Sequence, residues 1–459
     1  MEKLRLPGLY LFMVLAIGCD KQSPPIEPEP KEDPQSSQYG TPFAKIPAIA
    51  DVVLYEVNPR VYSSAKNLDG ITARLDSIRA LGVNVVWIMP IYQTGSVKSV
   101  GSPYAIKDYF SIHSDYGNLE DLRELVDKAH SLDMAVMMDW VANHTAWDNP
   151  WINNSGWYQT DANGNIIIPP GTNWQDVAEL NYDNQEMRQE MIKAMKYWVL
   201  EANVDGYRCD FASGVPGDFW RQALDTLRSV KDREILMFAE SDQKWLLDSG
   251  FDMIFGWNFY GRLKSIYNEN KSASEVYAAH VSEYSGLDAD EHIVRWITNH
   301  DENAWDATPQ YNFKSLDGAF GAFAIASYLG GVPLIYNGQE VGEPQRLPFF
   351  EGNNTQINWL LNPDYKQKYK TLMRFRAGSE AVRYGAIANH HTFDVAGFRK
   401  IKGNEDVYVI VNVRNKQVDY PIPTSLEGTV WRNIFDSGQT KTLSGQISLA
   451  PFECQILAR

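Results

Sequence analysis

Cysteine is scarce in this chain of 459 residues, which contains only Cys19, Cys209 and Cys454. Three widely separated cysteines give neither a disulfide framework nor a metal-binding pair. Basic residues are also in the minority, with 42 lysines and arginines against 58 acids and a net charge of −16. Nucleic acid and anionic lipid both select a positive surface, so neither is expected as the main partner.

Long apolar runs are missing except near the N-terminus, where "MEKLRLPGLYLFMVLAIGC" has a charged start and a short apolar core. The run is too short to span a membrane in the mature protein. Small residues followed by Cys19 resemble a bacterial lipobox, which implies a signal peptide over residues 1–18 and a lipidated Cys19. A plain signal peptide with a chance cysteine is the alternative.

Residues 19–42 are rich in proline and acids and predict a disordered tether. Together with a lipidated Cys19, the tether would hold a soluble domain at the bacterial cell envelope, on its periplasmic or its outer face. Membrane attachment is expected through this cysteine alone.

Apolar and aromatic residues are plentiful, at 44% and 12% of the chain. These values are typical of a well-packed globular protein. Aromatic side chains on an acidic protein favour a neutral ligand with flat apolar faces, such as a sugar.

Eight short apolar segments predict strands, most of them followed by an amphipathic helix. Near-continuous apolar runs suit strands that are buried on both faces of a parallel sheet. The alternation predicts an α/β fold, a closed (β/α)8 TIM barrel over residues 43–379, with a doubly wound sheet as the alternative. The strands are expected near residues 52–62, 83–91, 134–144, 204–212, 234–241, 251–259, 292–301 and 332–340.

Two segments depart from this alternation. Residues 145–182, after the third strand, are rich in Trp, Asn and Gly and show no helical period, which predicts a small inserted subdomain. Residues 380–459 contain short strands separated by turn residues and predict a C-terminal all-β sandwich.

Polar side chains gather at the ends of four predicted strands, where the active groups of such barrels lie. The acids on these strand ends crowd like charges at a cost in stability, so function explains them better than structure does. The residues are Asp139, Asn143 and His144 on the third strand, Arg208 and Asp210 on the fourth, Glu240 on the fifth, and Asn299, His300 and Asp301 on the seventh.

Glycoside hydrolysis is the chemistry that needs such a set. Arg208 and Asp210 are two residues apart on a strand and face the same way, so the arginine would keep Asp210 ionised as the nucleophile. Glu240 would be the acid that protonates the leaving oxygen, with a pKa raised by its anionic neighbours.

Six segments resemble, in order, the signature regions of the α-amylase family, glycoside hydrolase family thirteen. "DWVANH", "GYRCD", "FAES" and "TNHD" resemble its four catalytic regions, and "SPYAIKDYF" and "GGVPLIYNGQE" resemble two further ones. The resemblance runs from about residue 45 to the end and implies the barrel, the inserted subdomain and the sandwich.

The resemblance implies that Asp210 is the nucleophile, Glu240 the general acid/base and Asp301 the stabiliser of the transition state. It also implies a substrate-binding set in which Tyr104 stacks on the sugar and Asp108 follows it in the motif; the other members are His144, Arg208 and His300. Asp139 is expected to form an ion pair with Arg208 inside the barrel.

No cofactor is required for this chemistry. Relatives often hold a structural calcium ion; Asn143 matches one of its ligand positions and Glu179 lies near another. Ser213 and Gly214 stand where many relatives have Lys-His, a departure that argues against the ion. Four tryptophans of the inserted subdomain are either sugar platforms or subdomain core: Trp147, Trp151, Trp157 and Trp174.

The resulting hypothesis is a retaining hydrolase of α-1,4-glucosidic bonds in starch or maltodextrin. A retaining mechanism predicts that the carboxyl groups of Asp210 and Glu240 are about 5–5.5 Å apart. An α-glucosidase, a neopullulanase or debranching enzyme, and a transglycosylase share these residues and remain alternatives. A non-catalytic surface glucan-binding protein is the alternative of another class, which the three intact acids disfavour.

Overall fold

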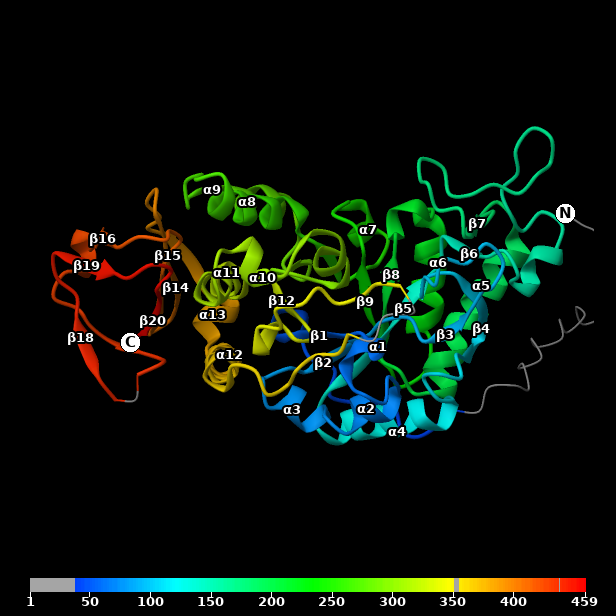
Figure 1. The fold of residues 1–459 in the computed structure, drawn as a ribbon, viewed down its shortest axis with the longest axis horizontal. Helices are drawn as coiled ribbons and strands as arrows, with labels where there is room; N and C mark the ends of the chain where they lie inside the picture. The colour runs from blue at the N-terminus through cyan, green and yellow to red at the C-terminus, as the bar shows by residue number, and fades with distance from the viewer. Residues whose placement is uncertain (1–37, 351–354, 437) are drawn as a thin grey trace, which may run out of the picture. The chain divides into compact units, whose positions relative to one another are not determined.

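Within residues 38–350, 355–436 and 438–459, which the computed structural model describes, eight parallel strands close into a barrel (Figure 1). Each strand pairs with the preceding and following barrel strand of the chain, and the last closes on the first with Leu54 opposite Leu334. The predicted (β/α)8 barrel is confirmed and the doubly wound sheet is excluded. The strands are β1 (Leu54–Val57), β2 (Val85–Ile88), β5 (Ala135–Val141), β8 (Gly206–Asp210), β9 (Leu236–Ala239), β10 (Met253–Phe255), β11 (His292–Arg295) and β12 (Val332–Tyr336).

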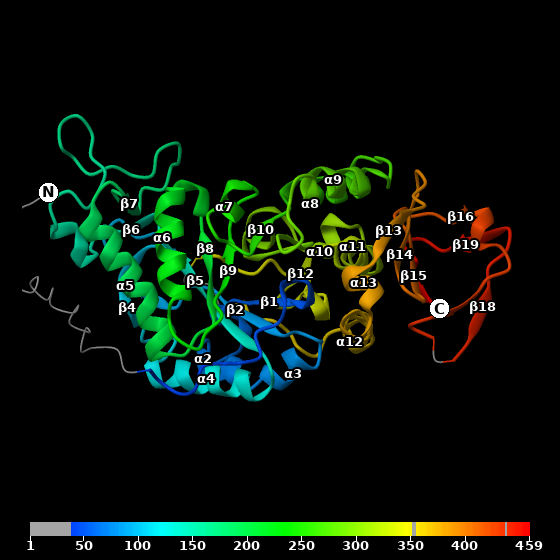
Figure 2. The same cartoon turned by 180° about the vertical axis from the view of Figure 1, so that it is seen from behind.

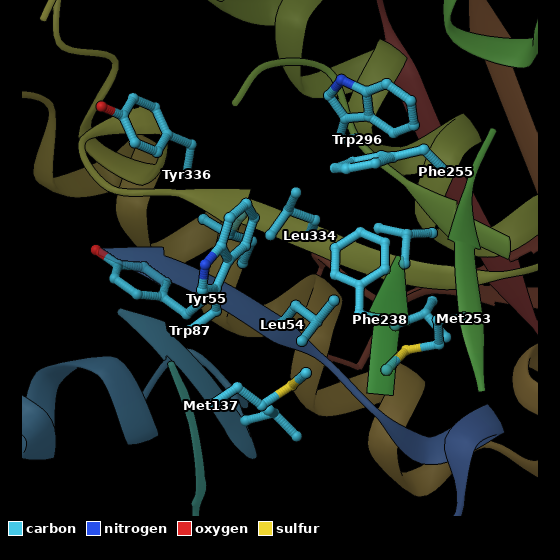
Figure 3. Close-up of a cluster of buried hydrophobic side chains, with 14 of the residues drawn as sticks. Leu54, Tyr55, Trp87, Met137, Phe238, Met253, Phe255, Trp296, Leu334 and Tyr336 are labelled. Carbon is cyan, nitrogen blue, oxygen red and sulfur yellow. The ribbon is translucent and has the colours of Figure 1, made fainter. Parts of the chain in front are cut away.

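The barrel strands are buried almost throughout, which explains why their sequences are continuous apolar runs. Figure 3 shows Leu54, Phe238 and Leu334 meeting inside the ring of strands. The interior is thus a packed core rather than a channel, and the functional groups are left at the strand ends.

Helices follow the strands, but all eight predicted strands are longer than the observed ones. The first ends at Val57 because Asn58 caps a helix that begins with Pro59. The third ends at Val141, and the sixth stops at Phe255 because a helix starts at Trp257. The helices are α1 (Pro59–Tyr62), α2 (Leu68–Thr72), α3 (Leu75–Arg79), α4 (Leu119–Ser131), α5 (Gln185–Glu201), α6 (Gly217–Arg228), α7 (Trp245–Asp248), α8 (Trp257–Asn268), α9 (Glu275–Tyr284), α10 (Pro309–Asn312), α11 (Leu316–Leu329), α12 (Pro363–Gly378) and α13 (Glu380–Tyr384).

Two small sheets lie in the loops beside the carboxyl ends of β2 and β5. β3 (Tyr92–Thr94) pairs with β4 (Ile106–Ile112), which contains most of the "SPYAIKDYF" segment. β6 (His144–Ala146) pairs with β7 (Val177–Glu179), so the predicted inserted segment begins and ends in one two-stranded ladder.

The C-terminal segment starts with the helix α13 and continues as a series of antiparallel strands. Six antiparallel strands form one sheet in the order β13-β14-β15-β20-β17-β18, and two form another; they are β13 (Ala386–Asn389), β14 (Val395–Lys402), β15 (Glu405–Asn412), β16 (Val418–Pro421), β17 (Val430–Asn433), β18 (Thr440–Thr442), β19 (Gln446–Leu449) and β20 (Cys454–Ala458). Side chains alternate along β15: Val407 and Val409 join the barrel core, whereas Tyr408 and Ile410 join a second apolar core. Apart from α13 and a short 3-10 helix at Thr424–Leu426, the predicted all-β character of this segment is confirmed.

The chain already contacts the barrel before residue 43, where the tether was predicted to end. The Tyr39 amide donates to the Leu200 carbonyl at 2.8 Å, and its hydroxyl donates to Asp127 at 2.8 Å. The predicted signal peptide, Cys19 and most of the tether lie outside the described residues. None of the helices in the described part of the chain combines the length and the apolar character that crossing a membrane requires.

Candidate active site

A cleft of about 740 Å³ opens at the carboxyl ends of the barrel strands. It brings together six of the eight predicted site residues: Tyr104, His144, Asp210, Glu240, His300 and Asp301. A seventh, Arg208, is fully buried directly beneath them.

Arg208 holds three carboxylates at once. Its Nη1 atom lies 2.7 Å from Asp139 Oδ1 and 3.2 Å from Asp210 Oδ1, and its Nη2 atom lies 2.9 Å from Glu240 Oε1. The predicted pairing with Asp139 is confirmed. The pairing with Asp210 is also present, but the guanidinium is shared with Glu240, which the strand pattern could not show because Glu240 comes from the next strand.

Asp139 is the anchor of this arginine. Its Oδ2 atom accepts hydrogen bonds from Trp87 Nε1 and from the Tyr104 hydroxyl, each at 3.1 Å, and the residue is 1% exposed. With its acceptors occupied by Trp87, Tyr104 and Arg208, Asp139 positions other groups and does not itself face the cleft.

Asp210 and Glu240 form one electrostatic unit. Burial and the neighbouring Glu240 raise the pKa of Asp210 well above its usual value, although Arg208 opposes the rise. Burial also raises the pKa of Glu240, and there Arg208 and the hydrogen bond from the Phe211 amide, at 2.8 Å, oppose it. The two carboxyl groups therefore titrate as a pair. The raised pKa expected for Glu240 is present, with burial as its main cause and Asp301 adding to it.

His300 is protonated at neutral pH, whereas His144 is neutral. Burial alone would lower the pKa of His300, but the carboxylates of Asp301 and Glu56 outweigh it and raise the pKa to about 9. Its Nδ1 atom bonds to Glu56, and its Nε2 atom lies 2.8 Å from the Tyr104 hydroxyl. Burial lowers the pKa of His144 to about 4, so at neutral pH the cleft holds one imidazolium and one neutral imidazole.

Replacing His300 with glutamine is expected to destabilise the protein in a pH window that the pKa shift sets. A raised pKa means that the folded state binds the proton more tightly than the unfolded state does. The stability advantage of wild type over His300→Gln should be full below about pH 6.5 and should decline as the pH rises to about 9. Thermal denaturation of both proteins between pH 5 and pH 10 measures this difference.

The matched control for this prediction is His144→Gln. Because the pKa of His144 is lowered, its contribution should be present above about pH 6.5 and should decline towards pH 4. Identical pH profiles for the two variants would contradict the charge assignment.

The turn after Asp210 has an unusual backbone. Phe211 adopts the left-handed conformation, with φ of 41°, which a non-glycine residue rarely does without a local constraint. A Cβ atom on Gly214 would lie 2.4 Å from Asn143 Oδ1 and 2.5 Å from the Phe211 ring. Glycine is therefore required where relatives were expected to carry histidine, and Ser213 is left to line the cleft.

Aromatic side chains form much of the remaining cleft wall. Trp174, 36% exposed, contacts the rings of His144 and Phe211, and it alone of the four predicted tryptophans lines the cleft. Trp151 and Trp157 pack on each other, Trp151 also packs on Tyr109, and Trp147 lies beneath the Lys98 ammonium at 3.5 Å.

Sequence reasoning missed the aromatic residues on the other loops. Trp257 at the start of α8, Trp305, Phe349 and Phe350 all line the cleft. Phe349 stacks on Tyr104 with ring centroids 5.6 Å apart, and Trp305 is 58% exposed. Their segments carry no periodic pattern of apolar residues. The adjacent aromatic residues Phe349 and Phe350, in the segment after the last barrel strand, are the one sequence signal that could have indicated this part of the wall.

Asp108 does not belong to this cleft, contrary to the prediction. Side chains alternate along β4, and the Tyr109 hydroxyl points inward to the carbonyls of Val141 and His144. Asp108 and Phe110 therefore face the other way, where Phe110 packs on Tyr197 of α5 and Asp108 accepts the Phe110 amide at 2.9 Å.

Asn143 and Glu179, the expected calcium ligands, do meet, but as a hydrogen-bonded pair. Asn143 Nδ2 donates to Glu179 Oε2 at 2.8 Å, and burial raises the pKa of Glu179 to about 7 despite that bond. Calcium takes six to eight oxygen ligands, preferably charged ones. The described residues place no group of three or more His, Cys, Asp or Glu side chains together as metal ligands. The residues present do not fit a calcium site.

Comparison with known proteins agrees with the geometry of the cleft. A sequence family described as "Alpha amylase, catalytic domain" matches residues 58–169 and 171–371. The chain is 27% identical over 426 residues to alpha-amylase 2 of Dictyoglomus thermophilum, covering 86% of this chain and 70% of that protein. It is 23% identical over 386 residues to a cyclomaltodextrinase of Thermoanaerobacter pseudethanolicus, covering 76% and 64%.

A solved structure is similar over nearly the whole described chain. The maltogenic alpha-amylase of Thermotoga neapolitana superposes with a TM-score of 0.79 at 26% identity, covering 90% of this chain and 99% of that one. Since the family match spans more than half of the sequence, and its segments contain the acids of the cleft, the chain belongs to the α-amylase family and is a glycoside hydrolase.

Proposed function

We propose that this protein is a retaining hydrolase of α-1,4-glucosidic bonds in starch or maltodextrin, acting through a covalent glycosyl ester on Asp210. The observation that carries the proposal is the shared guanidinium: Arg208 holds Asp210 and Glu240 side by side at the carboxyl ends of β8 and β9. A retaining mechanism needs such a close carboxyl pair.

The chemistry has two steps. An Asp210 oxygen bonds to the anomeric carbon while the glycosidic bond breaks and the Glu240 carboxyl gives its proton to the leaving oxygen. In the second step Glu240 takes a proton from water, the water oxygen bonds to the anomeric carbon, and the ester bond to Asp210 breaks.

Glu240 must carry a proton and Asp210 must be ionised before the first step. Arg208 contacts both carboxyl groups and donates a hydrogen bond to Asp210. A glycosidic oxygen beside Glu240 offers an acceptor that only the protonated carboxyl can use. Asp210 is then left ionised against Arg208, as attack on carbon requires.

Asp301 and the protonated His300 complete the reacting subsite. Their charged groups lie 3.4 Å apart, and both line the cleft. Asp301 would stabilise the positive charge that develops on the sugar, while His300 and the neutral His144 would bond to sugar hydroxyls. Tyr104 would stack on the ring.

The substrate class rests on the names of the relatives and on the cleft wall. The relatives are called alpha-amylase and cyclomaltodextrinase, names that refer to α-glucans. The aromatic wall formed by Trp174, Trp257, Trp305 and Phe350 suits the apolar faces of successive glucose rings.

An α-glucosidase, a neopullulanase or debranching enzyme, or a transglycosylase would use the same three acids. A non-catalytic binder has no use for a protonatable acid beside a nucleophile.

No cofactor takes part in these steps, and the Asn143–Glu179 hydrogen bond would replace a calcium ion. In the cell, Cys19 would be lipidated and would hold the enzyme at the bacterial envelope. The sequence that supports the anchor is the run of small residues before this cysteine.

Product analysis of residues 38–459 on soluble starch and on pullulan, with and without EDTA, tests the proposal. We expect mixed maltodextrins from starch, no product from pullulan, and less than a twofold change with EDTA. Panose or maltotriose from pullulan would move the enzyme to the neopullulanase or debranching alternatives. Loss of activity with EDTA, restored by calcium, would contradict the absence of a calcium site.

A further inference from the structure

A second cavity, of about 680 Å³, lies at the amino ends of the barrel strands, away from the catalytic acids. Its walls come from the turn Ile49–Asp51, from α9, from the start of β11 and β12, and from α13 and β14. α13 contacts both that first turn and β14, and Figure 2 shows α13 between the barrel and the C-terminal sheet. The cavity therefore lies where that sheet joins the barrel.

Lys400 of β14 lines this cavity without a partner. The residue is only 4% exposed. Among the described residues no acid forms an ion pair with it and no acceptor forms a hydrogen bond with its ammonium group. Burial and the nearby Arg376 lower its pKa to about 8, so it is still mainly charged at neutral pH. Its ammonium therefore has no protein counterion within the described residues and can pair with an anion that enters the cavity.

Two buried arginines add positive charge behind the Gly330–Gly331 wall of the cavity. Arg376, 2% exposed, donates from Nη2 to the carbonyls of Ala50 and Gly331, while its Nε and Nη1 atoms have no partner among the described residues. Arg295 bonds from Nε to the Gly330 carbonyl at 3.2 Å, and its Nη2 atom is likewise unpaired within the described chain.

The acids near the cavity are engaged elsewhere or face a different group. Glu283 pairs with Arg295, and Asp51 pairs with Arg383 and accepts the Tyr384 hydroxyl at 2.6 Å. Asp290 lines the cavity beside His292, whose pKa burial lowers although Asp290 opposes the change.

Neutral donors complete the lining. Burial, with Arg295 and Lys400 nearby, lowers the pKa of His280 to about 3, so its ring is neutral. Its Nδ1 atom is unpaired within the described residues, and Tyr284 brings a hydroxyl to the same wall.

We propose that this cavity binds a phosphate group, either as inorganic phosphate or as part of a phosphorylated sugar, with the Lys400 ammonium as its direct ion-pair partner. The site offers an ammonium without a protein counterion, a neutral imidazole, the Tyr284 hydroxyl and the field of Arg376 and Arg295, which together suit a compact oxyanion. The bound anion would supply the counterion that Lys400 lacks, and it would tie β14 to the barrel.

Thermal denaturation and calorimetric titration with sodium phosphate test the site, with sodium chloride at equal ionic strength as reference. We expect phosphate to raise the Tm of wild type and to bind with a Kd that increases at least tenfold in Lys400→Met. Lys402→Met is the matched control, because Lys402 lies on the same strand but is exposed and paired with Glu380. It should bind phosphate as wild type does, and starch hydrolysis should be unchanged in all three proteins.

A second variant keeps the test decisive if Lys400→Met fails to fold. Ile387 of β13 is directly opposite Lys400 in the ladder and also lines the cavity, so Ile387→Glu places a carboxylate beside the ammonium. This variant should lose the response to phosphate while keeping the Tm of wild type in chloride.

Titration with glucose 6-phosphate at the same concentrations distinguishes the two sources of the phosphate group. Tighter binding than inorganic phosphate would identify a phosphorylated sugar, and equal or weaker binding would identify the free ion. No phosphate-dependent shift in wild type, or an equal shift in Lys400→Met and Ile387→Glu, would overturn the proposal.

Discussion

Replacing Glu240 with glutamine is expected to lower kcat on starch by about 10³-fold, within the range of ~10²–10⁴ that general acid–base catalysis contributes. Glutamine has nearly the same shape and can still accept the Phe211 amide, so the turn after Asp210 should keep its conformation. What it lacks is a proton that it can give to the leaving oxygen. Steady-state kinetics on soluble starch measure the loss.

An aryl maltoside separates the role of Glu240 from that of Asp210. A phenolate with a low pKa leaves without protonation, so Glu240→Gln should lose much less activity on 4-nitrophenyl maltoside than on starch. Asp210→Asn should be inactive on both substrates, because no substrate replaces the nucleophile. Glu234→Gln, which changes an exposed acid just before β9, should behave as wild type. Equal losses on both substrates for Glu240→Gln would contradict its assignment as the acid.

Replacing Arg208 with methionine is expected to lower the free energy of unfolding by about 3–5 kcal/mol at pH 8, the cost of leaving buried charge without its partner. The substitution removes the one guanidinium that contacts Asp139, Asp210 and Glu240. Because burial raises the pKa of Asp139 and of Asp210, protonation should relieve the repulsion. The destabilisation should therefore shrink as the pH falls towards 5 and grow as it rises. Urea denaturation at pH 5 and pH 8 measures both effects.

Arg188→Met is the matched control for that experiment. Arg188 is also buried, but its acid partner, Asp218, is 65% exposed and can be solvated when the arginine is lost. Its loss should be smaller and nearly independent of pH. If Arg208→Met cost no more than Arg188→Met, the three carboxylates would not depend on Arg208.

The barrel could be predicted because the pattern of burial along each strand is local. A strand covered on both faces reads as an unbroken apolar run, and polar residues appear only where the run leaves the barrel. Asp210, Glu240 and His300 each follow such a run. Once the strands close into a barrel, their ends meet at one edge, so these residues could be expected in one cleft.

The residues that were misplaced depend on contacts between distant segments. Asp108 follows Tyr104 in its motif, but β4 turns its side chain towards α5 because Tyr109 takes the inward position. Trp257 begins α8 in a segment whose aromatic residues are more typical of strands. The contact between Arg208 of β8 and Glu240 after β9 crosses between strands, so no pattern within one strand records it.

The alternation of side chains along β15 has a consequence for how this protein could evolve or be divided. Val407, Val409 and Val411 are part of the barrel's own apolar core, although they come from the C-terminal sheet. That sheet is therefore a wall of the catalytic domain and not an appended module. A recombination event at residue 379 would replace one side of a packed interface, so the barrel and the sheet should be inherited together. A foreign sheet could replace this one only if the residues it turns towards the barrel matched the surface of α11.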